Sequence, residues 1–438
     1  MPQPESIVTF SRADAPITVP GGMAKSPRAM VLSGSFIMLM SMMVVNLFNF
    51  AYNVVMARVL GPSAFGHINA AVTILLLASC VSLAFQLVCT KFVARNVSAT
   101  GKASVVKTLM NKAWIPSLAF AAILFLAQKP IAYYLNLPSS WMIGILAAGI
   151  AFYAPVGVQR GAMQGACAFP RLGGNFVIEA FTRFAVGVGL VMAGYGVLGA
   201  VGAISASVIA AYFLPPIPAE LRTRTLSHMV EPPSFAEALQ AIVFFIGQVI
   251  INNIDILQVK HFFPASPAGV YAAIAQIGRL LYFACWFGIV NVMFPVTAAA
   301  AKDQDFRRAK GAGLPLLLVL GVSGIFVLGA GLFPHLIMGL VFGSEFIETD
   351  KLLALYAVGT GLYSLSVVLI AYEMSRRIAN TGWLQLIFSG ALVLAIQLFH
   401  SSLHEVIMVR IVLMAIMLVL VSVPFLRRHT SVSLEKAA

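Results

Sequence analysis

Residues 242–301 read IVFFIGQVIINNIDILQVKHFFPASPAGVYAAIAQIGRLLYFACWFGIVNVMFPVTAAAA. This stretch holds two long apolar segments joined by a short turn from Phe262 to Gly269. Each segment is long enough to cross the hydrocarbon core of a bilayer as a helix. Asp255 and Arg279 lie inside these segments, where charge is costly, so their side chains must face protein or a water-filled cavity. The two lie at similar depth and could pair with each other.

The rest of the chain has the same character. Of the 438 residues, 60% are hydrophobic and 10% are charged, and the mean hydropathy is +0.94. This composition is typical of a polytopic membrane protein. Continuous apolar segments favour membrane-spanning helices over a β-barrel, whose strands would alternate apolar and polar residues. We therefore expect an all-α polytopic membrane protein.

Twelve apolar segments are long enough to span a membrane, six in each half of the chain. We expect the spans at 31–57, 69–90, 108–127, 141–159, 173–194, 196–217, 237–262, 270–298, 312–333, 351–373, 383–400 and 404–426. The expected organisation is a disordered cytoplasmic tail over 1–30, an N-lobe over 31–217, a cytoplasmic linker over 218–236, a C-lobe over 237–426 and a cytoplasmic tail over 427–438. The first tail is rich in proline and polar residues and has no cleavable apolar core, so it is not a signal peptide.

The distribution of basic residues tests this count, because a missed span would disturb the alternation between the two sides of the membrane. Of the 28 Lys and Arg residues, 21 lie in the tails and connections of one side, and four lie on the other. The remaining three, Arg183, Arg279 and Arg410, lie inside spans. The richer side is the cytoplasmic one, so both termini are expected in the cytoplasm. The net charge of +13 therefore reflects topology and indicates no nucleic-acid partner.

The two halves of the chain resemble each other. The segment Asn53–Arg58 precedes Asp255–Lys260 by 202 residues, and Gly66 precedes Gly269 by 203. Six spans per half give both halves the same orientation, related by a pseudo-twofold axis along the membrane normal. Parallel repeats of this kind are a transporter architecture with the site between the lobes. The alternative is that any two membrane hairpins look alike.

The first span of each half carries a polar stripe at helical spacing. The stripes are Asn46, Asn49 and Asn53 in the first span, and Gln248, Asn252 and Asp255 in the seventh. In the repeat, Asn46 matches Gln248 and Asn53 matches Asp255, so both stripes are expected to face the axis and line a cavity between the lobes. The alternative is that they form hydrogen bonds between packed helices.

Five charged residues inside the spans are candidates for functional or structural roles. Arg279 can hold a phosphate with its planar guanidinium, or form a structural ion pair with Asp255, or form a pair that substrate opens. Asp255 can also titrate, which makes it a candidate for ion coupling. Glu179 and Arg183 have the favourable spacing for an intrahelical pair, and Glu179 is the second candidate for ion coupling. Arg410 is expected to snorkel toward the surface.

The sequence has no cofactor, metal or catalytic motif. The stretch from Gly61 to Gly66 is followed by His67, so it is not a phosphate-binding P-loop. His400 and His404 are four residues apart, with no further metal-type pair nearby. No paired spacing that would suggest a metal or redox site occurs among Cys80, Cys89, Cys167 and Cys285. We expect neither a cofactor nor an enzyme.

Several short motifs occur in a specific order along the spans. They are Arg58–Gly66, Asn252–Asp255, Ala268–Tyr271, Asn291–Pro295 and Leu340–Phe346. In sequence and spacing they resemble the polysaccharide-transporter branch of the multidrug/oligosaccharidyl-lipid/polysaccharide exporter superfamily, over Val31 to about Phe425.

This resemblance implies a V-shaped fold of two six-helix lobes around a cationic central cavity. It implies a flippase of the bacterial inner membrane that translocates a polyprenyl-diphosphate-linked oligosaccharide for surface or exopolysaccharide synthesis. The implied partners are that lipid-linked oligosaccharide, the lipid bilayer and other membrane proteins of polysaccharide assembly. Arg279 lies where a cavity cation is expected. The first span, however, lacks a basic residue, whereas better-known lipid-diphosphate flippases cluster several arginines in the first lobe.

Three other functions fit parts of the sequence. An exporter of small molecules or drugs on the same fold would favour an aromatic and acidic cavity. A membrane-embedded glycan polymerase or ligase would favour a long outer loop, and no outer loop here is long. A non-transporting scaffold would tolerate replacement of its polar residues.

Overall fold

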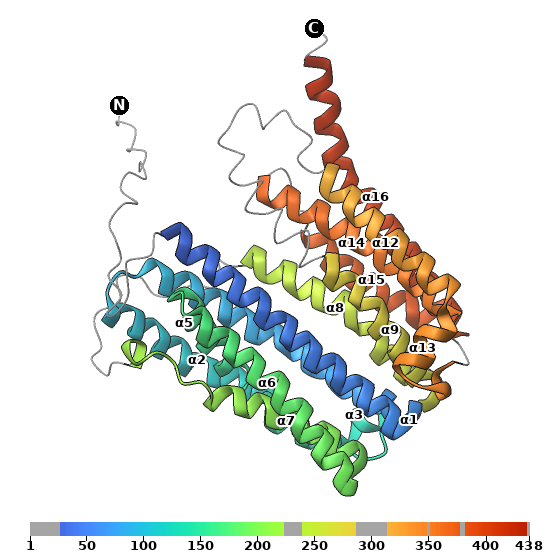
Figure 1. Cartoon of the computed structure of the whole chain (residues 1–438), viewed down its shortest axis with the longest axis horizontal. Helices are drawn as coiled ribbons and strands as arrows, with labels where there is room; N and C mark the ends of the chain where they lie inside the picture. Colours follow the sequence, from blue (N-terminus) through green and yellow to red (C-terminus); the bar gives the residue numbers. More distant parts are fainter. Residues whose placement is uncertain (1–26, 223–238, 286–312, 348–350, 377–381, 436–438) are drawn as a thin grey trace.

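The computed structural model describes residues 27–222, 239–285, 313–347, 351–376 and 382–435, and this part of the chain contains helices but no strands (Figure 1). The helices are α1 (Pro27–Arg95), α2 (Ala99–Leu126), α3 (Gln128–Tyr134), α4 (Trp141–Ile150), α5 (Tyr153–Gly165), α6 (Phe169–Leu190), α7 (Gly196–Phe213), α8 (Leu239–Phe262), α9 (Ala265–Cys285), α12 (Gly313–Leu332), α13 (Pro334–Val341), α14 (Leu352–Arg376), α15 (Gly382–Leu398) and α16 (Leu403–Glu435).

The first two expected spans form one helix that turns sharply at Gly61. Its backbone there has φ 77° and ψ 175°, a conformation that glycine adopts without steric cost. Pro62 follows, and its fixed φ suits the first position of the helix that resumes. The connection expected between residues 57 and 69 is therefore helical on both sides of one glycine.

The number of membrane crossings agrees with the sequence. Nine helical segments of the described chain are long and apolar enough to cross a membrane. Two of them, Phe36–Arg95 with 60 residues and Phe169–Phe213 with 45, turn back at glycines and cross twice. One shorter apolar helix, Trp383–Leu398, completes the set of twelve. The expected fold class, an all-α polytopic membrane protein with twelve spans, is confirmed.

Several expected boundaries were wrong. The fourth span is divided into α4 and α5 and continues to Gly165 instead of ending at 159. Helix α9 begins at Ala265 instead of 270, and the rest of its expected range, 286–298, lies outside the described residues. Helix α16 continues to Glu435, beyond the expected end at 426. The short helices α3 and α13 were not expected, because they are too short for a periodic signal.

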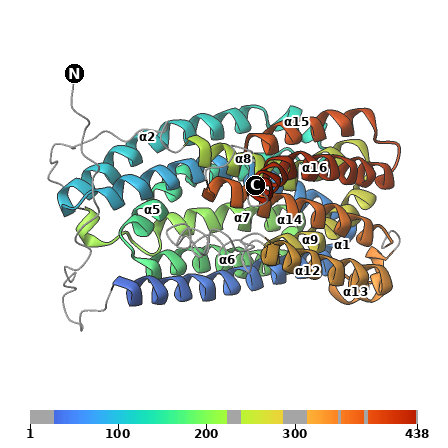
Figure 2. The same cartoon turned by 90° about the horizontal axis from the view of Figure 1, so that it is seen from above.

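The helices form two groups of six spans. Helices α1, α2 and α4–α7 make the N-lobe, and α8, α9, α12 and α14–α16 make the C-lobe. The lobes meet at one end and diverge toward the other, where α1 begins and α16 ends (Figure 1). We call the meeting point the closed end; it holds Gly61, α3, the turn between α8 and α9, and α13. Figure 2 shows α2 and α15 along one edge of the molecule, and the first half of α1 (dark blue) and α12 along the opposite edge.

Candidate functional site

The two matched turns of the repeat touch each other at the closed end. A Cβ added to Gly66 would lie 3.0 Å from the backbone nitrogen of Gly269, and a Cβ added to Gly269 would overlap the carbonyl oxygen of Pro62. The lobes therefore meet backbone to backbone at positions that the sequence related by an offset of 203 residues. Only glycine permits this approach at both positions.

Two hydrogen-bond latches flank this contact, and they too are related by the repeat. Arg58 of the N-lobe donates to the carbonyl oxygens of Leu340 and of Val341, the latter at 3.0 Å, where α13 ends. Lys260 of the C-lobe, which matches Arg58, donates to the carbonyl oxygen of Asn136 at 3.3 Å, just after α3 ends. Each basic residue thus reaches the equivalent short helix of the opposite lobe. We call these two contacts the twin latches.

Asp255 lies in the core of the C-lobe and does not face the space between the lobes. Its side chain is 0% exposed and accepts hydrogen bonds from Tyr271 at 2.8 Å and Tyr356 at 3.1 Å. Its ion-pair partner is Arg410, whose Nη1 lies 2.6 Å from Oδ2. The possible pair between Asp255 and Arg279 is therefore absent, and the expected cavity-lining position of Asp255 was wrong.

Arg410 does not snorkel to the surface. It is 1% exposed, and its guanidinium lies 4.6 Å from the centre of the Tyr356 ring. The sequence could have indicated this burial. A charged residue well inside a span that has no oppositely charged residue at helical spacing needs a partner on another helix.

Arg279 is left without a carboxylate in the described part of the chain. It is 7% exposed, and Nη1 donates to the neutral Oδ1 of Asn253 at 2.9 Å. Its Nε and Nη2 are buried and have no hydrogen-bond partner among the residues that the structure describes. On α9 it lies beside the exposed side chains of Leu280 and Phe283. Burying hydrogen-bond donors of a cation without acceptors costs free energy. An anion that accepts from these donors would remove this cost, so the guanidinium of Arg279 is suited to bind one.

The N-lobe holds a different cluster of charges around Glu179. The expected pair with Arg183 is confirmed at 2.8 Å, and Arg160 of α5 is a second ion-pair partner. The sequence placed Arg160 in a cytoplasmic connection, which was wrong, because α5 continues past it and buries it. Arg183 also donates to Oδ1 of Asn49 on α1 at 3.2 Å. The N-lobe therefore does contain buried arginines, although its first helix has none.

The remaining residues of the polar stripes lie at different levels of exposure. Asn46 is exposed, Asn49 is half-buried, and Asn53 is buried and bonded to the carbonyl oxygen of Asn49 at 2.8 Å. Gln248 and Asn252 are buried along α8. Unpartnered polar atoms remain on three of them: Oδ1 of Asn53, Nε2 of Gln248 and Oδ1 of Asn252. The structure does not bring the seven expected site residues together in one cavity.

The fold defines a class of protein: an all-helical, multi-pass membrane protein of two lobes. The chain belongs to the family whose model is described as "Polysaccharide biosynthesis protein", which matches residues 55–350. The fold agrees with the resemblance that the motifs show, because a transporter of the multidrug/oligosaccharidyl-lipid/polysaccharide exporter superfamily has it too.

Two solved structures show this fold. The lipid II flippase MurJ in an inward closed conformation has a TM-score of 0.70 and 12% identity, over 88% of this chain and 87% of that chain. An inward-facing multidrug resistance MATE family transporter of the superfamily has a TM-score of 0.65 and 15% identity, over 92% and 99%.

The curated relatives match a smaller share of this chain than the solved structures do. Uncharacterized proteins of two Mycobacterium tuberculosis strains are 21% identical over 285 residues. The match covers 63% of this chain, and the chain spans 65% of the length of these relatives. The family description names polysaccharide biosynthesis, and the fold is one that a lipid II flippase also has.

Proposed function

We propose that this protein is a flippase that moves a polyprenyl-diphosphate-linked oligosaccharide across the bacterial inner membrane for surface or exopolysaccharide synthesis. Three observations support the proposal: the family description names polysaccharide biosynthesis, a lipid II flippase has the same fold, and buried arginines remain in both lobes. Both termini are cytoplasmic in this proposal, in keeping with the distribution of basic residues. Its partners are the lipid-linked oligosaccharide, the bilayer and other membrane proteins of polysaccharide assembly.

The proposal rests mainly on the surroundings of Arg279. A diphosphate cannot enter hydrocarbon without partners, because burial of an unpaired charge is prohibitive. A guanidinium offers a planar pair of donors to a phosphate and stays charged when water is removed. Arg279 has unpartnered donors and no carboxylate among the described residues to neutralise it. It is therefore suited to hold a phosphate at mid-membrane depth.

The N-lobe contributes a second cation and a polar surface in this proposal. Arg183 and Arg160 share one carboxylate, so this cluster carries one positive charge in excess. Asn49 ties Arg183 to the polar stripe of α1, and Asn46 on that stripe is exposed. Asn side chains are suited to sugar hydroxyls, since an amide both donates and accepts.

The conformation follows from the proposed topology. With cytoplasmic termini, the closed end is periplasmic and the diverging end faces the cytoplasm. Substrate would then enter from the cytoplasmic leaflet, and rocking of the lobes would break the twin latches to release it on the other side.

Replacing Arg279 by alanine tests the proposal. We expect at least about a tenfold loss of polymer output, because a hydrogen bond to a charged group is worth about 1.5–3 kcal/mol. Lipid-linked repeat units should accumulate in the cytoplasmic leaflet, and Arg279→Lys should restore part of the output. The measurements are surface polysaccharide, lipid-linked intermediates and the amount of protein in the membrane.

Arg171→Ala is the matched control, because Arg171 is an exposed arginine outside both clusters. Normal polymer output from Arg279→Ala at normal membrane level would remove Arg279 from the mechanism. Uptake or efflux of organic cations by the purified protein would instead favour a drug exporter. The arrangement of acids argues against that alternative, since Asp255 and Glu179 are both neutralised by arginines.

A further inference from the structure

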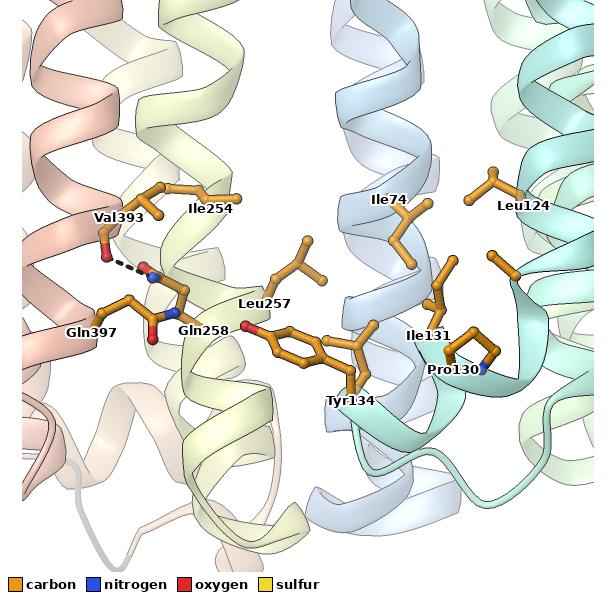
Figure 3. A pocket seen from close by; sticks show the side chains of 12 residues that line it. Ile74, Leu124, Pro130, Ile131, Tyr134, Ile254, Leu257, Gln258, Val393 and Gln397 are labelled. Atoms are coloured by element: carbon orange, nitrogen blue, oxygen red, sulfur yellow. Dashed lines mark hydrogen bonds between the residues drawn. The ribbon is translucent and has the colours of Figure 1, made fainter.

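A crevice lies between the two lobes near the closed end, on the edge that carries α2 and α15 (Figures 2 and 3). Its volume of about 620 Å³ falls within the range of about 300–1,000 Å³ for small-molecule sites. Ile74 of α1, the end of α2 and α3 form one wall, and α8 and α15 form the other. None of the seven expected site residues lines it, so the crevice is separate from the proposed phosphate site.

The crevice adjoins the interior of the bilayer. Of its twelve lining residues, only Tyr134, Gln258 and Gln397 have polar side chains, and none is charged. Exposed apolar side chains flank it on both lobes: Ile123, Leu126, Leu394 and Leu398. Because α2 and α15 cross the membrane, lipid chains are the molecules that surround these residues.

One polar atom inside the crevice has no hydrogen-bond partner in the described part of the chain. Gln258 is 4% exposed, and its Nε2 donates to the carbonyl oxygen of Val393 at 2.8 Å. Its Oε1 is buried and accepts no hydrogen bond, an arrangement that is costly unless a ligand or water supplies a donor.

The polar side chains of the crevice gather toward one end, among apolar ones. Figure 3 shows the Tyr134 hydroxyl directed across the crevice toward the side of Gln258 and Gln397, while Ile74 and Ile254 lie at the opposite end. The polar end is the one nearer the closed end, at the level of α3. An amphipathic molecule whose polar part lies at the membrane surface matches this arrangement.

We propose that the crevice binds one phospholipid of the leaflet at the closed end, independently of the proposed translocation function. An acyl chain lies against the apolar wall, and the glycerol and headgroup region lies at Tyr134 and Gln258. Lys129 is exposed at the start of α3, where it pairs with the lipid phosphate. A prenyl diphosphate is disfavoured as occupant, because Lys129 balances one phosphate and no charged side chain lines the crevice to balance a second.

A lipid in this position links the two lobes. Its chain contacts α3 on one side and α8 on the other, and these walls belong to lobes that separate when the closed end opens. Since a ligand shifts an equilibrium only by its different affinity for the two states, this lipid favours the state that is closed at this end.

Photolabelling of the full-length protein tests the proposal. The protein is placed in vesicles of phosphatidylethanolamine and phosphatidylglycerol with a trace of phosphatidylethanolamine that carries a diazirine on its acyl chain. We expect the label to concentrate on peptides that contain Ile131 and Leu257, well above the label on the lipid-exposed helix α12. Equal labelling of α12 and the crevice peptides would overturn the proposal.

A pair of variants sharpens the result. Leu257→Trp fills the crevice and should lower its labelling severalfold, whereas the matched Leu420→Trp, at an exposed position of α16 away from the crevice, should leave it unchanged. Excess unlabelled phospholipid should displace the label. Displacement by polyprenyl phosphate alone would identify the lipid carrier as the occupant and overturn the assignment to phospholipid. If Leu257→Trp does not fold, the wild-type labelling and competition decide the question. None of these readouts depends on the effect of Arg279→Ala.

Discussion

Both lobes hold a carboxylate inside the membrane, and they differ in how its charge is balanced. In the N-lobe, Glu179 is shared by Arg160 and Arg183. In the C-lobe, Oδ2 of Asp255 accepts from Arg410 and two tyrosines, and Oδ1 accepts the backbone N–H of Ile256 at 3.0 Å. Asp255 therefore has no capacity left for Arg279, which lies on the same hairpin.

This difference distinguishes arginines that stabilise the fold from an arginine whose charge is available to a ligand. Arg410 pairs with Asp255 and lies over the Tyr356 ring, which gives it a structural role, although its Nε has no hydrogen-bond partner among the described residues. Within the described ranges Arg279 has a single neutral hydrogen-bond partner, so its charge remains available to a ligand. In the N-lobe the excess charge is spread over two arginines that both contact Glu179, so neither is as free as Arg279. The variants below test this contrast, beginning with the largest expected effect.

Asp255→Asn should destabilise the protein the most. The change leaves Arg410 buried without a counterion, which costs about 3–5 kcal/mol. The free energy of unfolding of the purified protein in detergent measures the loss. The double variant Asp255→Asn, Arg410→Met should recover part of it, because both charges are then gone. A single variant as stable as the wild-type protein would show that the pair does not hold the C-lobe.

Glu179→Gln should have a smaller effect on stability, of about 2–3 kcal/mol, because it weakens hydrogen bonds to charged groups without removing every partner. Arg160 keeps its bond to Asn175 at 2.7 Å, and Arg183 keeps its bond to Asn49. The same unfolding measurement gives the comparison. A loss equal to or larger than that of Asp255→Asn would contradict the idea that the N-lobe charges are shared more loosely.

Arg58→Ala and Lys260→Ala should have the smallest effect on the free energy, about 0.5–1.5 kcal/mol for a hydrogen bond. The effect should appear as a shift of conformation rather than as unfolding, since the twin latches join the lobes only at the closed end. Distances between spin labels on the two lobes would measure the fraction open at this end. Lys351→Ala, an exposed lysine outside the latches, should leave that fraction unchanged.

The sequence predicted the features that depend on local pattern. Apolar length and loop charge predicted twelve spans, and the repeat offset matched Gly66 with Gly269 before any contact between them was known. Pairing across helices was not predictable in the same way. Asp255 and Arg279 lie at similar depth in the membrane. Depth alone does not determine how a helix is rotated about its own axis, and so which neighbour a side chain faces. That rotation turns Asn253 toward Arg279 and Asp255 toward Arg410. Arg160 was misplaced because the end of its helix was set six residues too early.

The twin latches have a consequence for how this contact would look among related proteins. Both basic side chains donate to main-chain oxygens, at residues 136, 340 and 341. Every amino acid supplies such an oxygen, so these three positions can change identity during evolution while the bonds persist. Correlated substitutions, which reveal many contacts between side chains, would therefore leave this junction between the lobes undetected.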